Sequence, residues 1–216
     1  MASTVDLVIF DMDGVLAQLD RAGRLARLAE LTGRTEADVQ RLVFDSDFET
    51  GAEAGAHPTG AEYLAELNRR LRSGITRQEW VDVRREAMTI DPEVLALAEE
   101  VAGRCGIALL TNNGSLLQET LPEIVPDVAR VFGRQAHTSS RFGARKPEAA
   151  VFQRLLAHHG VPPHRALFID DDADYVAAAG RVGLHTIHHR RAEPLRARLG
   201  PFGLVDHPAP PGAGPE

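Results

Sequence analysis

The chain has 216 residues, enough for one domain or for a core domain that carries a smaller insertion. Hydrophobic residues make up 44% of it and charged residues 25%, which is ordinary for a soluble globular protein. The formal net charge of -7 argues against a nucleic-acid partner, because no surplus of basic residues is available to neutralise phosphates. It leaves open a small anionic substrate, which needs only local positive charge.

Targeting signals are not visible in the sequence. The longest apolar runs fall well short of the roughly 18 residues that a membrane span requires. The start, MASTVD, has no basic region, and the apolar LVIF that follows is too short for a signal peptide. Cys105 is the sole cysteine, so no intrachain disulfide can form. We therefore expect a cytoplasmic protein without a membrane partner.

The first apolar run, residues 5–10, predicts a buried parallel strand because it is almost unbroken and rich in β-branched and aromatic side chains. It ends on Asp11 and Asp13, and Gly14 then lets the backbone turn away. Two like charges this close repel each other, so the site must supply a cation or raise one pKa. Taken alone, the pair is also consistent with an Asp that caps the next element.

Residues 17–88 carry amphipathic helical patterns with no strand between them, which predicts a small helical bundle inserted into the chain. Two of the predicted helices begin with capping-box spacing, at Thr59 with Glu62 and at Thr76 with Glu79. The turn-rich segment 48–60 is predicted to be a loop.

From Asp91 the chain alternates between helices and strands, which predicts a doubly wound, Rossmann-like parallel α/β sheet. The predicted elements are a helix from Pro92, a strand at 107–110, a helix capped by Ser115 and Gln118, a strand at 135–139, a helix from Pro147, a strand at 166–169, a helix at 173–180 and a strand at 184–187. The last sixteen residues hold five Pro and three Gly and are expected to be disordered. The predicted domains are a core of residues 1–16 and 89–200, a cap of residues 17–88 and a disordered tail of residues 201–216.

Polar residues cluster where the predicted strands end. Because the carboxyl ends of parallel strands open on one edge of the sheet, we expect these residues to converge. Singly, each could be a helix cap or a solvated charge, but their joint occurrence at one edge favours a functional site. Several carboxylates suit Mg²⁺, and a Lys with hydroxyl and amide donors suits a phosphoryl group. The residues are Asp11, Asp13, Thr111, Asn112, Lys146, Asp170 and Asp171.

Four segments at these positions, FDMDGVL, LLTNN, ARKPEAAVF and LFIDDDADYVAAA, resemble in order the motifs of the haloacid dehalogenase superfamily. The resemblance covers roughly residues 5–190. The chain is particularly similar to the subgroup that holds bacterial α-glucose-1-phosphate phosphatase and the phosphatase domain of soluble epoxide hydrolase. In such proteins the helical insertion after the first motif is a mobile cap over the active site, which matches residues 17–88.

The resemblance implies a covalent mechanism. Asp11 would be the nucleophile that attacks phosphorus to form an aspartyl-phosphate. Asp13 would protonate the leaving oxygen and then take a proton from the water that hydrolyses the intermediate. Family dehalogenases usually lack this second acid, so Asp13 favours phosphate chemistry over carbon–halogen cleavage.

The resemblance also implies a ligand set. Mg²⁺ would be bound by the Asp11 carboxylate, the Asp13 carbonyl oxygen and Asp171, with support from Asp170. The residues implied to contact the phosphoryl group or balance its charge are Thr111, Asn112 and Lys146.

One position departs from the pattern of the subgroup. Tyr175 stands where that subgroup usually has Asn, and the adjacent Asp174 could substitute for it. The phenol could reach over the site towards substrate or cap while Asp174 or water supports Asp171. It could instead point away into the packing, which we favour because the next residues of the helix are small and apolar.

Two further sets of residues are less informative. Three histidines near the predicted last strand invite a metal hypothesis, but their spacing spreads them over both faces, which favours surface or packed side chains. They are His185, His188 and His189. The cap residues that could meet substrate, among which the sequence does not choose, are Gln18, Phe48, Glu49 and His57.

Together these features predict a phosphoric monoester hydrolase: a Mg²⁺-dependent phosphatase for a small phosphorylated metabolite such as a sugar phosphate. A mutase-type phosphotransferase, which passes the phosphoryl group to a sugar, is the main alternative. A non-catalytic binding or regulatory module on the same fold is the other. Neither the substrate nor the oligomeric state follows from the sequence.

Overall fold

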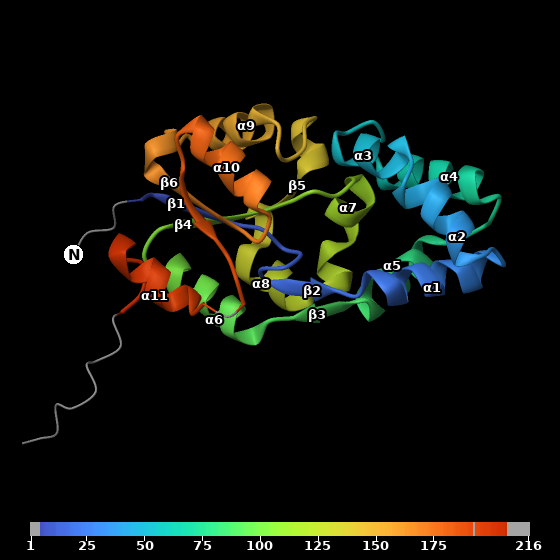
Figure 1. Ribbon diagram of the computed structural model, residues 1–216, viewed down its shortest axis with the longest axis horizontal. Helices are drawn as coiled ribbons and strands as arrows, with labels where there is room; N and C mark the ends of the chain where they lie inside the picture. Colours follow the sequence, from blue (N-terminus) through green and yellow to red (C-terminus); the bar gives the residue numbers. More distant parts are fainter. Residues whose placement is uncertain (1–4, 192, 207–216) are drawn as a thin grey trace, which may run out of the picture.

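The centre of the structure is a parallel five-stranded sheet (Figure 1). Its strands are β1 (Leu7–Phe10), β4 (Gly106–Thr111), β5 (Ala136–Thr138), β6 (Ala166–Asp170) and β7 (His185–His188). The computed structural model describes residues 5–191 and 193–206, and orders these strands β5-β4-β1-β6-β7. All neighbouring pairs run parallel, so their carboxyl ends share one edge with β1 at its middle.

Helices cover both faces of this sheet, which confirms the predicted doubly wound α/β fold. They are α6 (Pro92–Ala102), α7 (Ser115–Ile124), α8 (Pro126–Phe132), α9 (Ala149–His159), α10 (Ala173–Val182) and α11 (Leu195–Leu199). Val8 and Phe10 face a core cluster with α6, α7, α8 and α11, whereas Leu7 and Ile9 face a second cluster with α9 and α10 (Figure 1). A strand buried on both sides has this alternation.

The predicted helical insertion follows β1. Its helices are α1 (Arg21–Thr32), α2 (Glu36–Val39), the π-helix η1 (Gln40–Phe44), α3 (Asp47–Glu53), α4 (Gly60–Leu71) and α5 (Arg77–Glu86). We call residues 21–86 the cap. The chain enters and leaves it through an antiparallel pair, β2 (Ala17–Leu19) and β3 (Met88–Ile90). The sequence does not predict this pair, because three residues are too few to show a two-residue period. The exact domain boundaries and the mobility of the cap stay predictions.

The predicted loop at residues 48–60 is wrong in its first half, because α3 runs from Asp47 to Glu53. Its Ser46 side chain accepts a hydrogen bond from the backbone N–H of Phe48 and so caps the helix. Phe48 and Ala52, four residues apart, point into the core. The glycines of this stretch favour a loop prediction, but packing of these two side chains into the core stabilises a helix.

The predicted cap of α7 by Ser115 and Gln118 is also wrong, because Gly114 is the N-cap and makes no side-chain hydrogen bond there. Gln118 instead reaches the edge strand β5. Its amide nitrogen donates to the Ala136 carbonyl at 2.9 Å, and its amide oxygen accepts from the Thr138 N–H at 2.8 Å. The Gln118 side chain therefore hydrogen-bonds the free edge of β5 instead of capping α7.

Two predicted boundaries shift. The helix expected from Pro147 begins at Ala149, because Lys146 and Pro147 form a turn before it. The disordered tail predicted from residue 201 does not start there, since Leu204 and Val205 are buried in the core after a 3-10 turn, η5 (Gly200–Phe202). The rest of that predicted tail, residues 207–216, lies outside the described residues.

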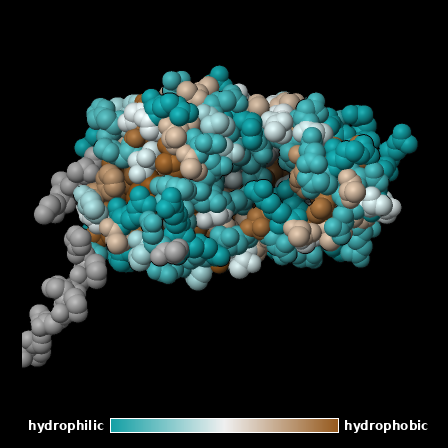
Figure 2. Space-filling model, viewed as in Figure 1, coloured by the Kyte–Doolittle hydropathy of each residue, from teal (hydrophilic) through white to brown (hydrophobic). Residues whose placement is uncertain are grey.

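None of the helices in the described ranges is long and apolar enough to cross a membrane. The face shown in Figure 2 is largely hydrophilic, with hydrophobic residues exposed in small groups.

Both predicted capping boxes are present, and the one at Thr59 allows a test. The Thr59 hydroxyl accepts from the Glu62 N–H at 3.2 Å, and the Glu62 carboxylate accepts from the Thr59 N–H at 3.1 Å. Thr59→Ala should lower the free energy of unfolding by about 1 kcal/mol in urea titrations, because it leaves a helix N–H without its partner. Thr59→Ser keeps the hydroxyl and serves as the control. Equal losses in both variants would show that the hydroxyl is not what stabilises α4.

Candidate active site

The polar residues predicted to converge do meet at the carboxyl edge of the sheet. A crevice of about 630 Å³ lies there, lined by residues of both core and cap. The predicted site residues that line it are Asp11, Asp13, Thr111, Asn112, Lys146 and Asp171. Asp170 lies directly behind Lys146 and is completely buried.

Lys146 joins two strand ends through a buried ion triad. Its ammonium donates to Asp11 Oδ1 at 2.8 Å and to Asp170 Oδ2 at 2.6 Å. Burial alone would lower the pKa of the ammonium, but the charges of Asp11 and Asp170 outweigh it and raise this pKa. Lys146 therefore stays charged. Burial raises the pKa of the Asp11 carboxyl, against the opposing charge of Lys146.

The acidic residues fit a hard divalent cation. Carboxylate oxygens of Asp11, Asp170 and Asp171 lie within 4.8 Å of one another, which suits the oxygen ligands that Mg²⁺ prefers. Burial and the neighbouring Asp170 raise the pKa of Asp171, as expected for acids held together. Lys146 supplies one positive charge against three carboxylates, so a cation at this point would relieve the remaining repulsion.

Gly14 permits the close approach of these acids. It adopts a left-handed φ of 92°, and a Cβ atom added there would overlap the Asp171 carboxylate. On the same loop, Asp13 Oδ1 is buried and has no hydrogen-bond partner within the described ranges. A buried carboxylate oxygen without a partner is rare in folded proteins and is often found in a site that binds a further group.

The segment after β4 positions Lys146 as well as lining the crevice. The Asn112 side chain donates to the Lys146 carbonyl and accepts from the Lys146 N–H, both at 2.9 Å. The Asn112 amide therefore orients the Lys146 main chain, and Asn112 also lines the crevice. Its predicted contact with a phosphoryl group stays a prediction. The Thr111 hydroxyl accepts from the Asn113 amide at 2.8 Å, which leaves its own hydrogen free to donate.

Tyr175 lies over the site, so the expectation that it points away into the packing is wrong. The Lys146 ammonium lies 5.0 Å from the centre of its ring, a cation–π distance. The Asn112 amide donates to its hydroxyl at 3.4 Å, and the side chain lines the crevice. Further along the helix, Ala178 and Ala179 are the small residues that pack into the second core cluster, and Tyr175 lies partly buried beside that cluster.

The cap contributes two arginines that the sequence analysis does not select. Arg84, at the crevice wall, is 1% exposed, and burial lowers its pKa to about 10. Arg24 donates to Glu49 at 3.2 Å, and the Nε atoms of both arginines are buried with no partner among the residues described. Each Arg occupies the apolar face of its helix, four residues from Leu28 in α1 or Trp80 in α5. A charged residue in an apolar stripe is the signal that could have found them.

Of the cap residues that the sequence suggests could meet substrate, Glu49 lines the crevice. Gln18, Phe48 and His57 are not among the described residues that line it. The ring of His188 hydrogen-bonds the Asp171 main-chain oxygen at 2.9 Å. His185 is exposed beside Phe202, and His189 is buried.

Comparisons with known proteins agree with this geometry. A sequence model of the haloacid dehalogenase-like hydrolases matches residues 5–183. A phosphatase of Mycobacterium tuberculosis is 28% identical over 199 residues, which are 84% of this chain and 85% of that protein. A HAD-like family hydrolase from Porphyromonas gingivalis has a similar structure, with a TM-score of 0.77 at 23% identity over 94% of this chain and 100% of that chain.

A second solved structure is a HAD family enzyme from Bacteroides thetaiotaomicron in complex with magnesium and inorganic phosphate. Its TM-score is 0.72 at 18% identity, over 90% of this chain and 98% of that chain. At these identities the two structures establish a shared fold.

The buried triad predicts a pH-dependent cost of removing Lys146. Lys146→Met leaves Asp11 and Asp170 buried without a counter-charge and should lower the free energy of unfolding by about 3–5 kcal/mol at pH 7. Unpaired buried carboxyls have raised pKa values in the folded state, so the folded variant binds more protons than the unfolded chain. The loss of unfolding free energy in Lys146→Met, relative to the parent protein, should therefore become smaller as the pH falls from 7 to 5.

Urea denaturation in EDTA at both pH values measures this effect. Arg165→Met, which removes an exposed ion pair with Asp6, is the control and should show a much smaller change at either pH. A deficit for Lys146→Met that does not vary with pH would contradict the assignment of two unpaired buried carboxylates.

Proposed function

Because the chain belongs to the haloacid dehalogenase-like hydrolases, we propose that it is a Mg²⁺-dependent phosphatase that hydrolyses a small phosphate monoester through an intermediate on Asp11. The observation that carries this proposal is the state of the two acids on the first loop. Asp11 is held by Lys146 through Oδ1, whereas Asp13 Oδ1 is buried and meets no partner in the part of the chain that the structure describes. One acid is oriented for attack, and the other is free to exchange a proton. The phosphatase relative and the phosphate-bound structural neighbour support the same reaction class.

The metal site of the proposal uses the acids that fit it. Asp11, Asp171 and the Asp13 carbonyl oxygen would hold Mg²⁺, with Asp170 behind them. When bound, Mg²⁺ neutralises charge on the phosphoryl oxygens and orients them. The Lys146 ammonium and the Thr111 hydroxyl add donors on the side of the core.

The proposed reaction has two steps. The Asp11 carboxylate attacks phosphorus, and the bond between phosphorus and the ester oxygen breaks as that oxygen takes the proton of Asp13. Water then attacks the phosphorus of the aspartyl-phosphate and gives a proton to Asp13, which restores both acids and releases inorganic phosphate.

The cap arginines support a substrate with oxygen acceptors at its non-reacting end. Arg24 and Arg84 each keep a buried Nε without a partner at or near the crevice wall, and Glu49 is the carboxylate that pairs with Arg24. Hydroxyl or anionic groups on a small metabolite would accept hydrogen bonds from these donors. A sugar phosphate has both the acceptors and a size suited to a crevice of about 630 Å³.

Substitution of the two acids tests the mechanism. Asp11→Asn should abolish phosphate release, because an amide cannot attack phosphorus, and Asp13→Asn should lower kcat by roughly 10²–10⁴-fold. Activity of the parent protein should stop in EDTA and return with Mg²⁺. Release of inorganic phosphate from a panel of sugar phosphates is the measurement, and Asp127→Asn, which changes an exposed acid of α8, is the control. Substantial turnover by Asp11→Asn would exclude the covalent route, and transfer of the phosphoryl group to a sugar instead of water would indicate a mutase.

Substitution of Arg84 tests the substrate class. Arg84→Met should lower kcat/KM for phosphorylated sugars by about 10-fold or more, the usual scale for a lost charge-assisted hydrogen bond. It should change kcat/KM for phenyl phosphate much less, because the ring of that ester has no acceptor at its far end. Arg85→Met, on the exposed face of the same helix, is the control. Equal losses on both substrates would show that Arg84 does not contact the non-reacting end.

A further inference from the structure

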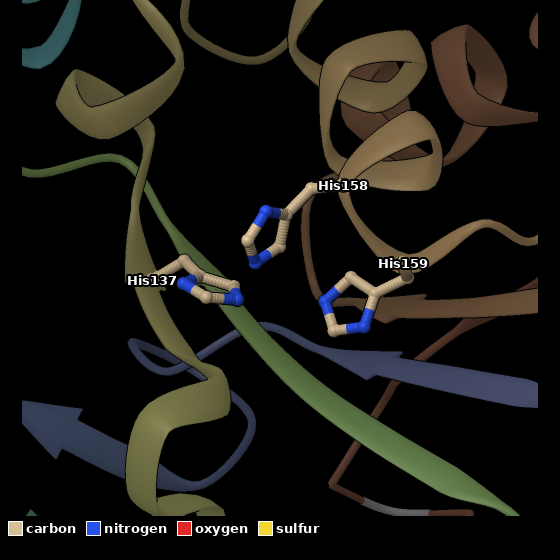
Figure 3. Close-up of side chains that lie close together, drawn as sticks. All are labelled: His137, His158 and His159. Carbon is tan, nitrogen blue, oxygen red and sulfur yellow. The ribbon is translucent and has the colours of Figure 1, made fainter.

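Three histidine rings meet on the second face of the sheet, apart from the crevice. His137 comes from the edge strand β5, and His158 and His159 come from the last turn of α9 (Figure 3). One ring nitrogen from each lies within 4.8 Å of the other two. Figure 3 shows these nitrogens turned towards the space between the rings. Successive side chains of a strand point to opposite faces of the sheet. Because Ala136 on β5 faces the first core cluster, His137 faces α9 and meets its two histidines.

The spacing of the rings matches that of ligands on one metal ion. The centres of the His137 and His158 rings are 5.2 Å apart, those of His137 and His159 are 5.5 Å apart, and those of His158 and His159 are 5.2 Å apart. A Zn–N bond of about 2.0–2.1 Å places an imidazole centre roughly 3.2 Å from the ion, and the tetrahedral angle then separates two such centres by about 5.2 Å.

The ring nitrogens lack other partners. His137 is completely buried, and neither of its nitrogens has a hydrogen-bond partner among the described residues. The Nε2 atom of His159 is buried and unpartnered as well. Edge-to-face stacking accounts for attraction between the rings but satisfies none of these nitrogens. A shared cation would satisfy one nitrogen from each ring.

The electrostatic surroundings are mixed but permit such a cation. A metal binds the neutral form of a histidine ring, and complete burial favours that form at His137. The negative end of the α9 dipole lies at His158 and His159. Arg141 opposes a cation here, but its side chain is exposed and its charge is screened by solvent.

We propose that His137, His158 and His159 bind one transition-metal ion of the Zn²⁺ class, with a fourth position open to water. Three neutral imidazoles select Zn²⁺, Co²⁺, Ni²⁺ or Cu²⁺, whereas Mg²⁺ prefers the oxygen ligands of the crevice. Two sites of different ligand chemistry would then exist on one chain. The histidine site would link the end of α9 to the edge of the sheet.

Cobalt titration of the metal-free protein tests this site, because tetrahedral Co²⁺ with nitrogen ligands absorbs visible light strongly and octahedral Co²⁺ with oxygen ligands absorbs weakly. We expect strong bands that saturate at one equivalent and are removed by Zn²⁺. The bands should persist in Asp171→Asn, which alters the acidic crevice, and in His164→Ala, which removes an exposed histidine outside the cluster.

His158 is exposed, so His158→Ala should fold, and circular dichroism checks that it does. This variant should lose the strong bands and bind Zn²⁺ at least about 10-fold more weakly, the minimum seen when even an outer contact of a metal site is removed. His159→Gln, a second substitution in the cluster, should have the same two effects. Weak cobalt bands in the parent protein, or strong bands and unchanged Zn²⁺ affinity in His158→Ala, would overturn the proposal.

Discussion

The ammonium of Lys146, held between two buried carboxylates, is the interaction on which the rest of the site depends. Asp11 ends β1 and Asp170 ends β6, and these strands lie side by side in the sheet. Without a counter-charge, two carboxylates buried this closely could not both stay ionised. Asn112, after β4, holds the main chain of Lys146 on both sides of the residue. Lys146 thus connects the ends of three neighbouring strands, two through its ammonium and one through its main chain.

The charge left over by this triad lies on the core side of the crevice. The core presents more acid than Lys146 can balance, and so attracts a cation. The cap presents Arg24 and Arg84 from the opposite side, where the carboxylates of Asp45, Glu49 and Glu53 also line the crevice. The cap wall therefore offers local donors and not a surplus of positive charge. A phosphate ester bound with its cation would balance the acids of the core and could accept hydrogen bonds from the arginines of the cap.

The parts of the site that could be predicted from sequence are those set by local rules. Asp11, Asp13 and Asp171 follow apolar strands, and parallel strands end at one edge, so their convergence needs no knowledge of side-chain packing. The direction of Tyr175 and the role of the Asn112 amide depend on Lys146, which is far away in the chain. The pairing of His137 with α9 likewise depends on contacts between distant segments, and contacts of this kind leave no periodic mark in the sequence. Arg84 does leave a mark, because it is a charged residue in the apolar stripe of its helix.

The Gln118 amide bears on how separate copies of this chain meet. A strand at the edge of a sheet offers free N–H and C=O groups on which another chain can add a strand. Gln118 occupies two such groups on β5, so extension of the sheet past this edge must first break two hydrogen bonds. In a partly folded chain the same edge is open until α7 docks. We therefore expect the risk of intermolecular β-pairing to be concentrated in the interval before α7 packs, and to end when that helix is in place.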